Sequence, residues 1–206
     1  MSNASTTPAS LRTLVEALRA LHELDFSTEE LWDQAARALE VALTDSELRT
    51  LSREWPQSHD RANSRYTNLL FHEDPDYGFV INGLVKDETG RTPVHDHGHA
   101  WVAYGLMEGA ETIVRYSRTG AEEPTGLAVM HIAAEFGLVA GEVDLVPPWT
   151  FHAEEAKTER SVALMVRSAK VGVFAHRRFD PTSGEIYEHP GPKQIDYVFP
   201  KVEGNR

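Results

Sequence analysis

The segment 92–109 holds the residues best suited to chemistry, because it places His95, His97 and His99 at alternate positions ahead of an apolar, strand-favouring run. On a strand, alternate side chains share one face, and their Cα atoms lie roughly 6 to 7 Å apart. Two imidazoles at that spacing can reach one metal ion. Such a pair is also a common coincidence in a chain with ten histidines, so it needs independent support.

The segment 141–152 supplies that support. It reads GEVDLVPPWTFH, which is typical of a tight turn, a short strand and a proline-stiffened corner that ends in His152. Three imidazoles from two strands form a facial metal site, and imidazole suits iron, zinc, copper or nickel. We therefore predict His95, His97 and His152 as metal ligands.

Together these segments resemble the two sequence motifs of the cupin superfamily, G-x5-H-x-H-x4-E-x6-G and G-x5-P-x-G-x2-H-x3-N. Six residues fall in register with the defining positions of the motifs: His95, His97, Gly109, Gly141, Pro147 and His152. The resemblance implies a mainly β fold around the metal site, a double-stranded β-helix or jelly-roll barrel.

The positions at which the chain departs from the motifs indicate which branch of the superfamily it resembles. Val102 stands at the glutamate of the first motif, and Trp149 and Ala156 replace the later glycine and the asparagine of the second. A neutral three-histidine set is that of the thiol dioxygenase branch, and the phrase P-x-H-D-H followed twelve residues on by Gly109 resembles cysteine dioxygenase. The resemblance implies an Fe(II) dioxygenase, with zinc, nickel or manganese as alternative ions.

The substrate residues of cysteine dioxygenases are not matched. Their Tyr-Thr-Arg segment supplies an arginine for the substrate carboxylate, whereas this chain has Asn68 at the arginine's position, after Tyr66. Asparagine cannot form a bidentate charged clamp. Their Ser-x-His-x-Tyr set would fall on Met165, Arg167 and Ala169. We therefore expect the partners to be O2 and a small-molecule substrate other than cysteine.

Arg167 is the most informative departure, because a charge that ends an apolar run is costly to bury unless it is paired. If the strand alternation continues inward from Ala163 and Met165, the side chain of Arg167 enters the cavity near the metal and can clamp an anion. The alternative is a structural salt bridge with Glu154, Glu155 or another carboxylate.

Three further residues are candidates in this region. Tyr66 and Tyr104 can each present a hydroxyl near the ion, although buried tyrosines usually only pack. His99 can extend the same face into the cavity, replace His95 in a shifted register, or simply close the strand. Asp96 points to the opposite face from its neighbours, which favours a supporting role over ligation.

Composition places the chain among ordinary globular proteins. With 206 residues, 41% hydrophobic and 25% charged, it is expected to form one main core. A net charge of −12 argues against nucleic acid and anionic membranes as partners. The absence of cysteine excludes disulfides, Cys-ligated zinc and a thiol nucleophile. Its oligomeric state is left open between monomer and homodimer.

Location is predicted from what the chain lacks. The N-terminus has no basic region followed by an apolar core, so we expect no secretory signal. No apolar run approaches the roughly 20 residues that a membrane helix needs. We therefore predict a cytoplasmic protein.

The expected elements divide the chain into a helical segment, 1–60, packed on a barrel with a C-terminal extension, 61–206, as a single structural unit. Helices are predicted over 8–24 and from capping boxes opening at Ser27 and Thr44. Turns are predicted at 87–90 and 180–184. Strands are expected near 66–71, 78–86, 92–95, 100–107, 111–117, 127–133, 143–146, 160–168 and 171–179.

Three functions remain open from the sequence. The first is an Fe(II) dioxygenase of the cysteine dioxygenase-like branch. The second is a metal-cupin isomerase, lyase or hydrolase that uses the ion as a Lewis acid. The third is a non-catalytic cupin that binds a small molecule. Cupins host many chemistries, so the fold alone does not decide among them.

Overall fold

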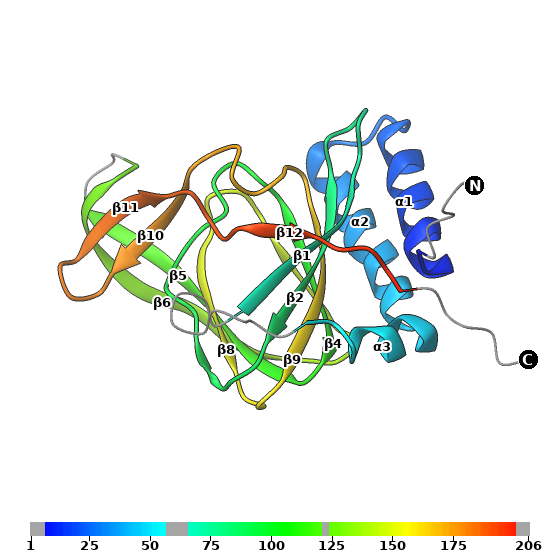
Figure 1. The fold of residues 1–206 in the computed structure, drawn as a ribbon. Helices are drawn as coiled ribbons and strands as arrows, with labels where there is room; N and C mark the ends of the chain where they lie inside the picture. The colour runs from blue at the N-terminus through cyan, green and yellow to red at the C-terminus, as the bar shows by residue number, and fades with distance from the viewer. Residues whose placement is uncertain (1–6, 57–65, 121–123, 201–206) are drawn as a thin grey trace, which may run out of the picture.

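The computed structural model describes residues 7–56, 66–120 and 124–200. Within these ranges, two six-stranded sheets face each other, and three helices cover the outer face of the first sheet (Figure 1). The predicted fold class, a mainly β jelly-roll barrel with an N-terminal helical layer, is confirmed. The predicted boundary between residues 60 and 61 lies outside the described residues.

The first sheet separates the helices from the barrel interior. Its neighbours pair antiparallel except for β12, which runs parallel to β1. In spatial order its strands are β12 (Gln194–Asp196), β1 (Tyr66–Glu73), β2 (Val80–Lys86), β9 (Ser161–Arg167), β4 (Val102–Glu108) and β7 (Val143–Val146).

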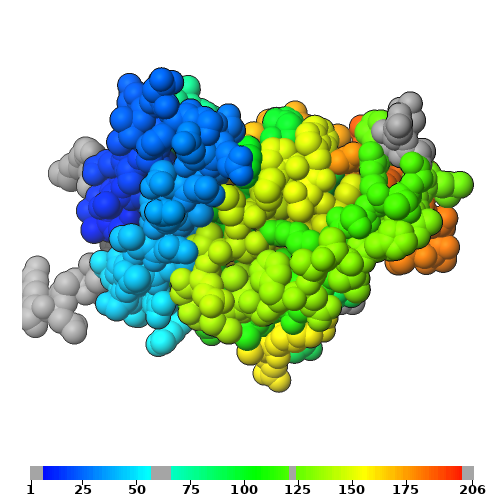
Figure 2. Space-filling view, turned by 180° about the vertical axis from the view of Figure 1, so that it is seen from behind, coloured from blue at the N-terminus to red at the C-terminus, as the bar shows by residue number. Residues whose placement is uncertain are grey.

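The second sheet closes the other side of the barrel, and all its strands pair antiparallel. In spatial order these are β10 (His176–Asp180), β11 (Glu185–His189), β6 (Gly126–Val139), β5 (Ala110–Gly120), β8 (Phe151–Ala156) and β3 (Gly90–Arg91). Figure 2 shows the helices gathered on one side of the molecule, while the strands of the barrel form the rest of that face.

The helices are α1 (Ala9–His22), α2 (Thr28–Leu43) and α3 (Ser46–Ser52). The capping box at Ser27 is confirmed. The one predicted at Thr44 is wrong: Asp45 caps α3 by accepting hydrogen bonds from the backbone N–H groups of Glu47 and Leu48, at 2.8 and 3.4 Å. Thr44 instead ends α2, and its hydroxyl donates to a carbonyl of that helix. No helix in the described part of the chain combines the length and apolarity needed to cross a bilayer.

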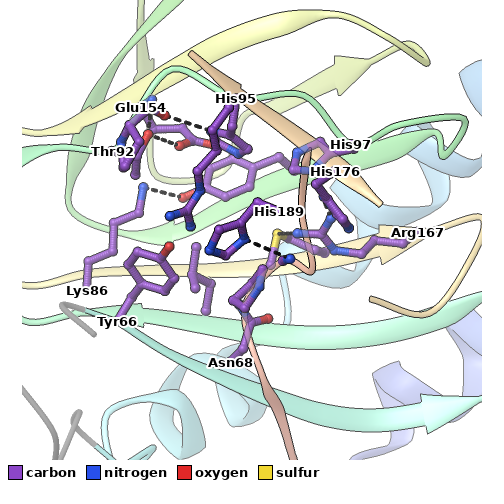
Figure 3. A pocket seen from close by; sticks show the side chains of 17 residues that line it. Tyr66, Asn68, Lys86, Thr92, His95, His97, Glu154, Arg167, His176 and His189 are labelled. Carbon is purple, nitrogen blue, oxygen red and sulfur yellow. Dashed lines mark hydrogen bonds between the residues drawn. The ribbon is translucent and has the colours of Figure 1, made fainter. Parts of the chain in front are cut away.

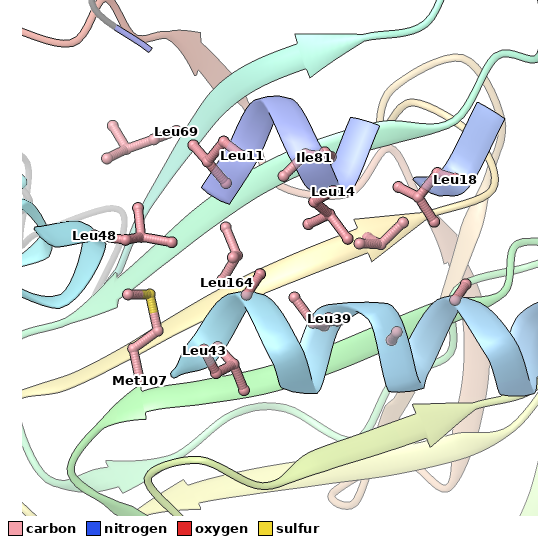
Figure 4. Packing of buried hydrophobic residues seen from close by; sticks show 14 of the residues in the cluster. Leu11, Leu14, Leu18, Leu39, Leu43, Leu48, Leu69, Ile81, Met107 and Leu164 are labelled. Atoms are coloured by element: carbon pink, nitrogen blue, oxygen red, sulfur yellow. The ribbon is translucent and has the colours of Figure 1, made fainter. Parts of the chain in front are cut away.

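The main apolar core lies between these helices and the first sheet (Figure 4). Leucines from α1 and α2, among them Leu14 and Leu39, pack against Ile81 and Leu164 of the sheet. Helix α2 comes close because β4 has a glycine at 105, where an added Cβ would lie 2.9 Å from a methyl group of Leu43. This layer fixes the outer face of the sheet that lines the barrel.

Some predicted elements need correction. The segment 92–95 is not a strand, because Pro93 has no N–H for a continuous ladder, and only His95 forms isolated bridges. The segment 171–179 becomes a strand only at His176, after a turn that contains Gly172 with φ +90°. The turn at 87–90 does not form a hairpin, because it connects β2 of the first sheet to β3 of the second. The turn at 180–184 does form one, because it connects the paired strands β10 and β11. Strands β3, β8, β11 and β12 lie outside the predicted strands.

Candidate metal centre

Both histidine segments meet inside the barrel. The backbone N–H groups of His95 and His152 each donate to the other's carbonyl at 2.9 Å, which sets their ring centroids 4.5 Å apart. The ring of His97 lies 5.0 Å from that of His95 and 4.9 Å from that of His152. The predicted convergence of three imidazoles is thus present in the structure, and Figure 3 shows two of them, His95 and His97.

A carboxylate completes the cluster. One ligand-capable atom from each of His95, His97, His152 and Glu154 lies within 4.8 Å of those of the others. Glu154 follows His152 by two residues on β8, so both side chains point into the barrel. The expected set of three neutral histidines is therefore incomplete. The alternation that joined His95 to His97 would also have found Glu154, which the sequence analysis considered only as an ion-pair partner.

The loop between the first two histidines is fastened to β10. Asp96 is fully buried and points away from the cluster, where it forms an ion pair with Arg177. One Asp96 oxygen accepts the Nε–H of Arg177 at 2.6 Å, and the other accepts the backbone N–H groups of Gly98 and Arg177 at 3.0 and 2.9 Å. Asp96 therefore supports the loop rather than binding the ion.

Trp149 connects the two motif loops. Its backbone N–H donates to the carbonyl of Gly98 at 2.7 Å, and its ring lies under the guanidinium of Arg177, 4.7 Å from the ring centroid. Its φ angle is +62°, in the left-handed region that favours glycine. This explains why the second motif has glycine here, and it shows that this chain retains the backbone conformation without that residue.

The hydrogen bonds of two of the rings, those of His95 and His152, suit metal binding. Nδ1 of His95 lies 2.9 Å from the carbonyl of Pro93, and Nδ1 of His152 lies 3.0 Å from that of Thr150. A carbonyl only accepts, so each Nδ1 donates and a neutral ring leaves its lone pair on Nε2. Nε2 of His152 faces a carboxylate oxygen of Glu154 at 3.2 Å. Two facing lone pairs are stabilised by a cation between them, so these residues fit a metal ion.

Burial keeps the cluster in its ligating protonation states. It lowers the pKa of His97 well below its ordinary value and that of His95 to about 3, and the neighbouring His152 contributes to both shifts. Burial alone would raise the pKa of Glu154, but Lys86 and His152 outweigh it and hold that pKa well below its usual range. At neutral pH the imidazoles of His95 and His97 are thus neutral and the carboxylate of Glu154 is ionised.

Arg167 enters the same cavity, as the alternation on β9 predicted. It is 5% exposed, and its Nη1 lies 3.3 Å from Nδ1 of His97. Its Nε has no hydrogen-bond partner, and no carboxylate of the described residues lies within 4.0 Å. The predicted structural salt bridge with Glu154 or Glu155 is therefore wrong, and no other described carboxylate takes their place. Burial lowers the pKa of Arg167 to about 10, so it remains charged at neutral pH.

The other candidate residues differ in how their side chains are placed relative to the cluster. Tyr104 is held by Glu111, at 3.0 Å, and by Lys86, at 3.1 Å, and burial raises the pKa of its hydroxyl well above 10. Tyr66 lines the cavity beside the cluster. His99 is exposed, and its ring packs on Phe174 at 4.4 Å, outside the metal cluster.

His176 is a cavity residue that the sequence gave no reason to select. It is 3% exposed, and its ring centroid lies 5.7 Å from that of His97. Its Nδ1 lies 3.2 Å from the carbonyl of Asp96, while its buried Nε2 has no partner. Because Nδ1 donates to the carbonyl, Nε2 offers a free acceptor to a ligand.

Comparisons with known proteins give a likeness of fold. No family model and no curated protein matches the chain. KdgF from Halomonas sp. is similar over 57% of this chain and 89% of its own, with 14% identity and a TM-score of 0.41. A Streptococcus pyogenes protein of unknown function is similar over 58% and 84%, with 14% identity and a TM-score of 0.40. The Schizosaccharomyces pombe Cnp3 cupin domain is similar over 52% and 66%, with 9% identity and a TM-score of 0.39.

Proposed function

We propose that this protein is a metal-dependent cupin oxygenase in which His95, His97, His152 and Glu154 bind Fe(II). In this proposal it is a dioxygenase that acts with O2 on a small-molecule substrate other than cysteine. The observation that carries the proposal is the convergence of three imidazoles and one ionised carboxylate within 4.8 Å, beside a cavity that also holds Arg167, which has no carboxylate partner among the described residues.

The donor set supports this choice of ion. Histidines together with a carboxylate are the ligand types of non-haem Fe(II) oxygenases, and a closed barrel limits access of water to the site. When bound, Fe(II) supplies the one-electron and O2 chemistry that side chains lack. The chain itself supplies fixed ring orientations through the carbonyls of Pro93 and Thr150.

The substrate side of the site is built for an anion. Arg167 has donors that no carboxylate in the described residues satisfies, and its guanidinium reaches His97. It therefore orients an anionic substrate group next to the cluster. In this role it replaces the arginine of cysteine dioxygenases, whose position is occupied here by Asn68. Tyr66 adds a phenol to the cavity wall, whereas Tyr104 is engaged by Glu111 and serves to fix Lys86. These roles complete the proposed site.

A second candidate follows from Glu154. A carboxylate held ionised beside His152 also suits zinc, nickel or manganese, and these ions act as Lewis acids in isomerases, lyases and hydrolases. The two candidates differ in their need for oxygen. Turnover that continues under strict anaerobiosis would support the second candidate, and turnover that stops would support the first.

Metal binding is tested with matched variants. We expect the purified protein to bind one Fe(II) anaerobically, His152→Ala to lose at least 100-fold in affinity, and Glu154→Gln to lose roughly 10- to 100-fold. His99→Ala is the control, because His99 lies outside the cluster, and it should bind like the unaltered protein. Equal affinities across the three variants would overturn the assigned ligands.

Activity is tested by oxygen uptake. Iron-loaded protein is supplied with a panel of small thiols and of short and long carboxylates, and products are analysed by mass for the gain of two oxygen atoms. We expect uptake with at least one anionic compound. Silence across the panel at full iron occupancy would contradict the dioxygenase assignment.

A further inference from the structure

Two cavities of very different size adjoin beside the metal cluster and share part of their walls. The inner cavity contains His95, His97, Glu154 and Arg167 and has a volume of about 50 Å³. The outer cavity has a volume of about 750 Å³. Both are lined by the same neck residues: Tyr66, Lys86, Thr92, Pro93 and Arg178. A ligand can therefore extend from the cluster through the neck into the outer cavity.

The volumes divide the ligand into two parts. One water needs about 10 to 15 Å³ by this measure, so the inner cavity has room for only three to five groups of that size. This suits the head of a ligand, such as a carboxylate, and little more. The outer cavity falls in the range of about 300 to 1,000 Å³ that is typical of small-molecule sites. Most of the ligand's bulk would thus lie outside the neck.

Beyond the neck, one part of the wall of the outer cavity is polar and consists of residues 88–91, and the rest is apolar. Val94, Tyr116, Met130, Phe179 and Pro181 come from the histidine segment, from β5 and β6, and from the end of β10 and the turn that follows it. All of them are half-buried or exposed. Apolar and aromatic side chains left accessible beside a polar centre are typical of the wall that receives the body of a ligand.

The charges of the two cavities favour an anionic head. Arg167 has no carboxylate partner among the described residues, and the side chain of Arg178 at the neck makes no ion pair or hydrogen bond with any of them. His176 adds an acceptor nitrogen for a hydroxyl or amine of the ligand. In a chain with a net charge of −12, two guanidinium groups that no described carboxylate neutralises are a local attraction for anions.

We propose that the substrate is an amphiphilic carboxylate whose head binds at Arg167 beside the metal and whose alkyl or aryl body lies in the outer cavity. This inference rests on the proposed function. It defines the substrate class as longer than the small thiols that the inner cavity alone would accept.

A chain-length series tests the inference. Binding of unbranched carboxylates from acetate to decanoate to the purified protein is measured by calorimetry, without reliance on turnover. We expect weak, nearly constant affinity for the shortest members, then a gain of up to about four-fold per methylene once the chain passes the neck. An affinity that is flat from acetate to decanoate would overturn the inference.

Variants separate the two parts of the path. Phe179→Ala and Met130→Ala should each lower decanoate affinity by about 10-fold and leave acetate unchanged. Arg167→Met should lower the affinity for all lengths by the same factor. Phe136→Ala is the control, because Phe136 is an exposed aromatic on β6 outside both cavities, and it should bind the whole series normally. Equal losses in Phe179→Ala and Phe136→Ala would contradict the assigned wall.

Failure of this inference is distinguishable from failure of the proposed function. Tight Fe(II) binding without any dependence of affinity on chain length would support the metal site and contradict the amphiphilic substrate. A dependence of affinity on chain length in a protein that binds no metal would support the outer cavity as a ligand site and contradict the proposed oxygenase function.

Discussion

The two faces of β9 are buried to the same degree but do opposite things. On one face, Val162, Leu164 and Val166 pack into the core beneath the helices. On the other face, the interior of the barrel receives Ala163, Met165 and Arg167. All seven residues of the strand are buried, so burial alone does not separate them. The difference teaches that stability is concentrated on the helix side, while the interior side holds polar groups for a ligand.

The largest expected effect is on the helix side. Leu164→Ala removes a fully buried side chain from the core and should lower the free energy of unfolding by about 2 to 5 kcal/mol. Fe(II) affinity should stay unchanged in the folded protein, because Leu164 points away from the cluster. Urea unfolding and metal titration measure the two quantities. Val41→Ala, at a position 70% exposed on α2, is the control and should stay within about 0.5 kcal/mol.

The second effect is a pH dependence of the free energy of unfolding, and a share of it comes from His176 in the barrel interior. Burial, with a contribution from Arg167, lowers the pKa of His176 to about 4, from 6.5 in the unfolded chain. Below pH 6.5 the unfolded state therefore takes up a proton that the folded state resists. Stability present above pH 6.5 is lost as pH falls towards 4, by on the order of 3 kcal/mol from this residue.

Urea unfolding of metal-free protein from pH 7.5 to 4.5 measures this loss. His176→Gln should reduce the dependence by the share of this residue and leave the share of His95 and His97, and His131→Gln, at an exposed position on β6, should keep it in full. A pH dependence that is identical in both variants would show that His176 is not its source.

A smaller effect of opposite sign is expected at Arg167. Removal of a buried charge that no carboxylate pairs with costs little, so Arg167→Met should raise the free energy of unfolding by about 1 kcal/mol. Leu164→Ala, three residues away on the opposite face, should lower the free energy of unfolding instead. A loss of more than 2 kcal/mol in Arg167→Met would mean that the guanidinium stabilises the fold rather than serving a ligand.

The smallest effect belongs to the loop that precedes β8. Because Trp149 has φ +62°, Trp149→Gly relieves a conformation that costs L-residues about 1 kcal/mol, whereas Trp149→Ala keeps the strain. Both variants lose the contact with Arg177. We expect the glycine variant to be the more stable by about 0.5 to 1 kcal/mol in thermal unfolding. At exposed Val173, where φ is not positive, alanine should be better than glycine.

The sequence predicted the parts of the site that follow from alternation in a recognised strand. His95, His97 and His152 converge, and the inward position of Arg167 follows from Ala163 and Met165. Their roles in binding metal and substrate stay predictions. The helix positions followed from apolar periodicity and a capping box, because those signals are local.

The rest depended on contacts that are distant along the chain. Strand β8 escaped prediction because its sequence FHAEEA has two adjacent glutamates, and nothing local shows that one of them is buried beside Lys86 and His152. His176 reaches the cavity only because Asp96 and Arg177 join the histidine loop to β10. Polar residues in a barrel interior therefore look like surface residues until the sheets are placed.

The link between Asp96 and Arg177 sets the order in which the protein can mature. Synthesis proceeds from the N-terminus, so all four proposed ligands are made before Arg177. Until that arginine and the hairpin of β10 and β11 have emerged, the loop that holds His97 lacks its anchor. A nascent chain must therefore wait for residues that never touch the metal before it can hold one in the native geometry.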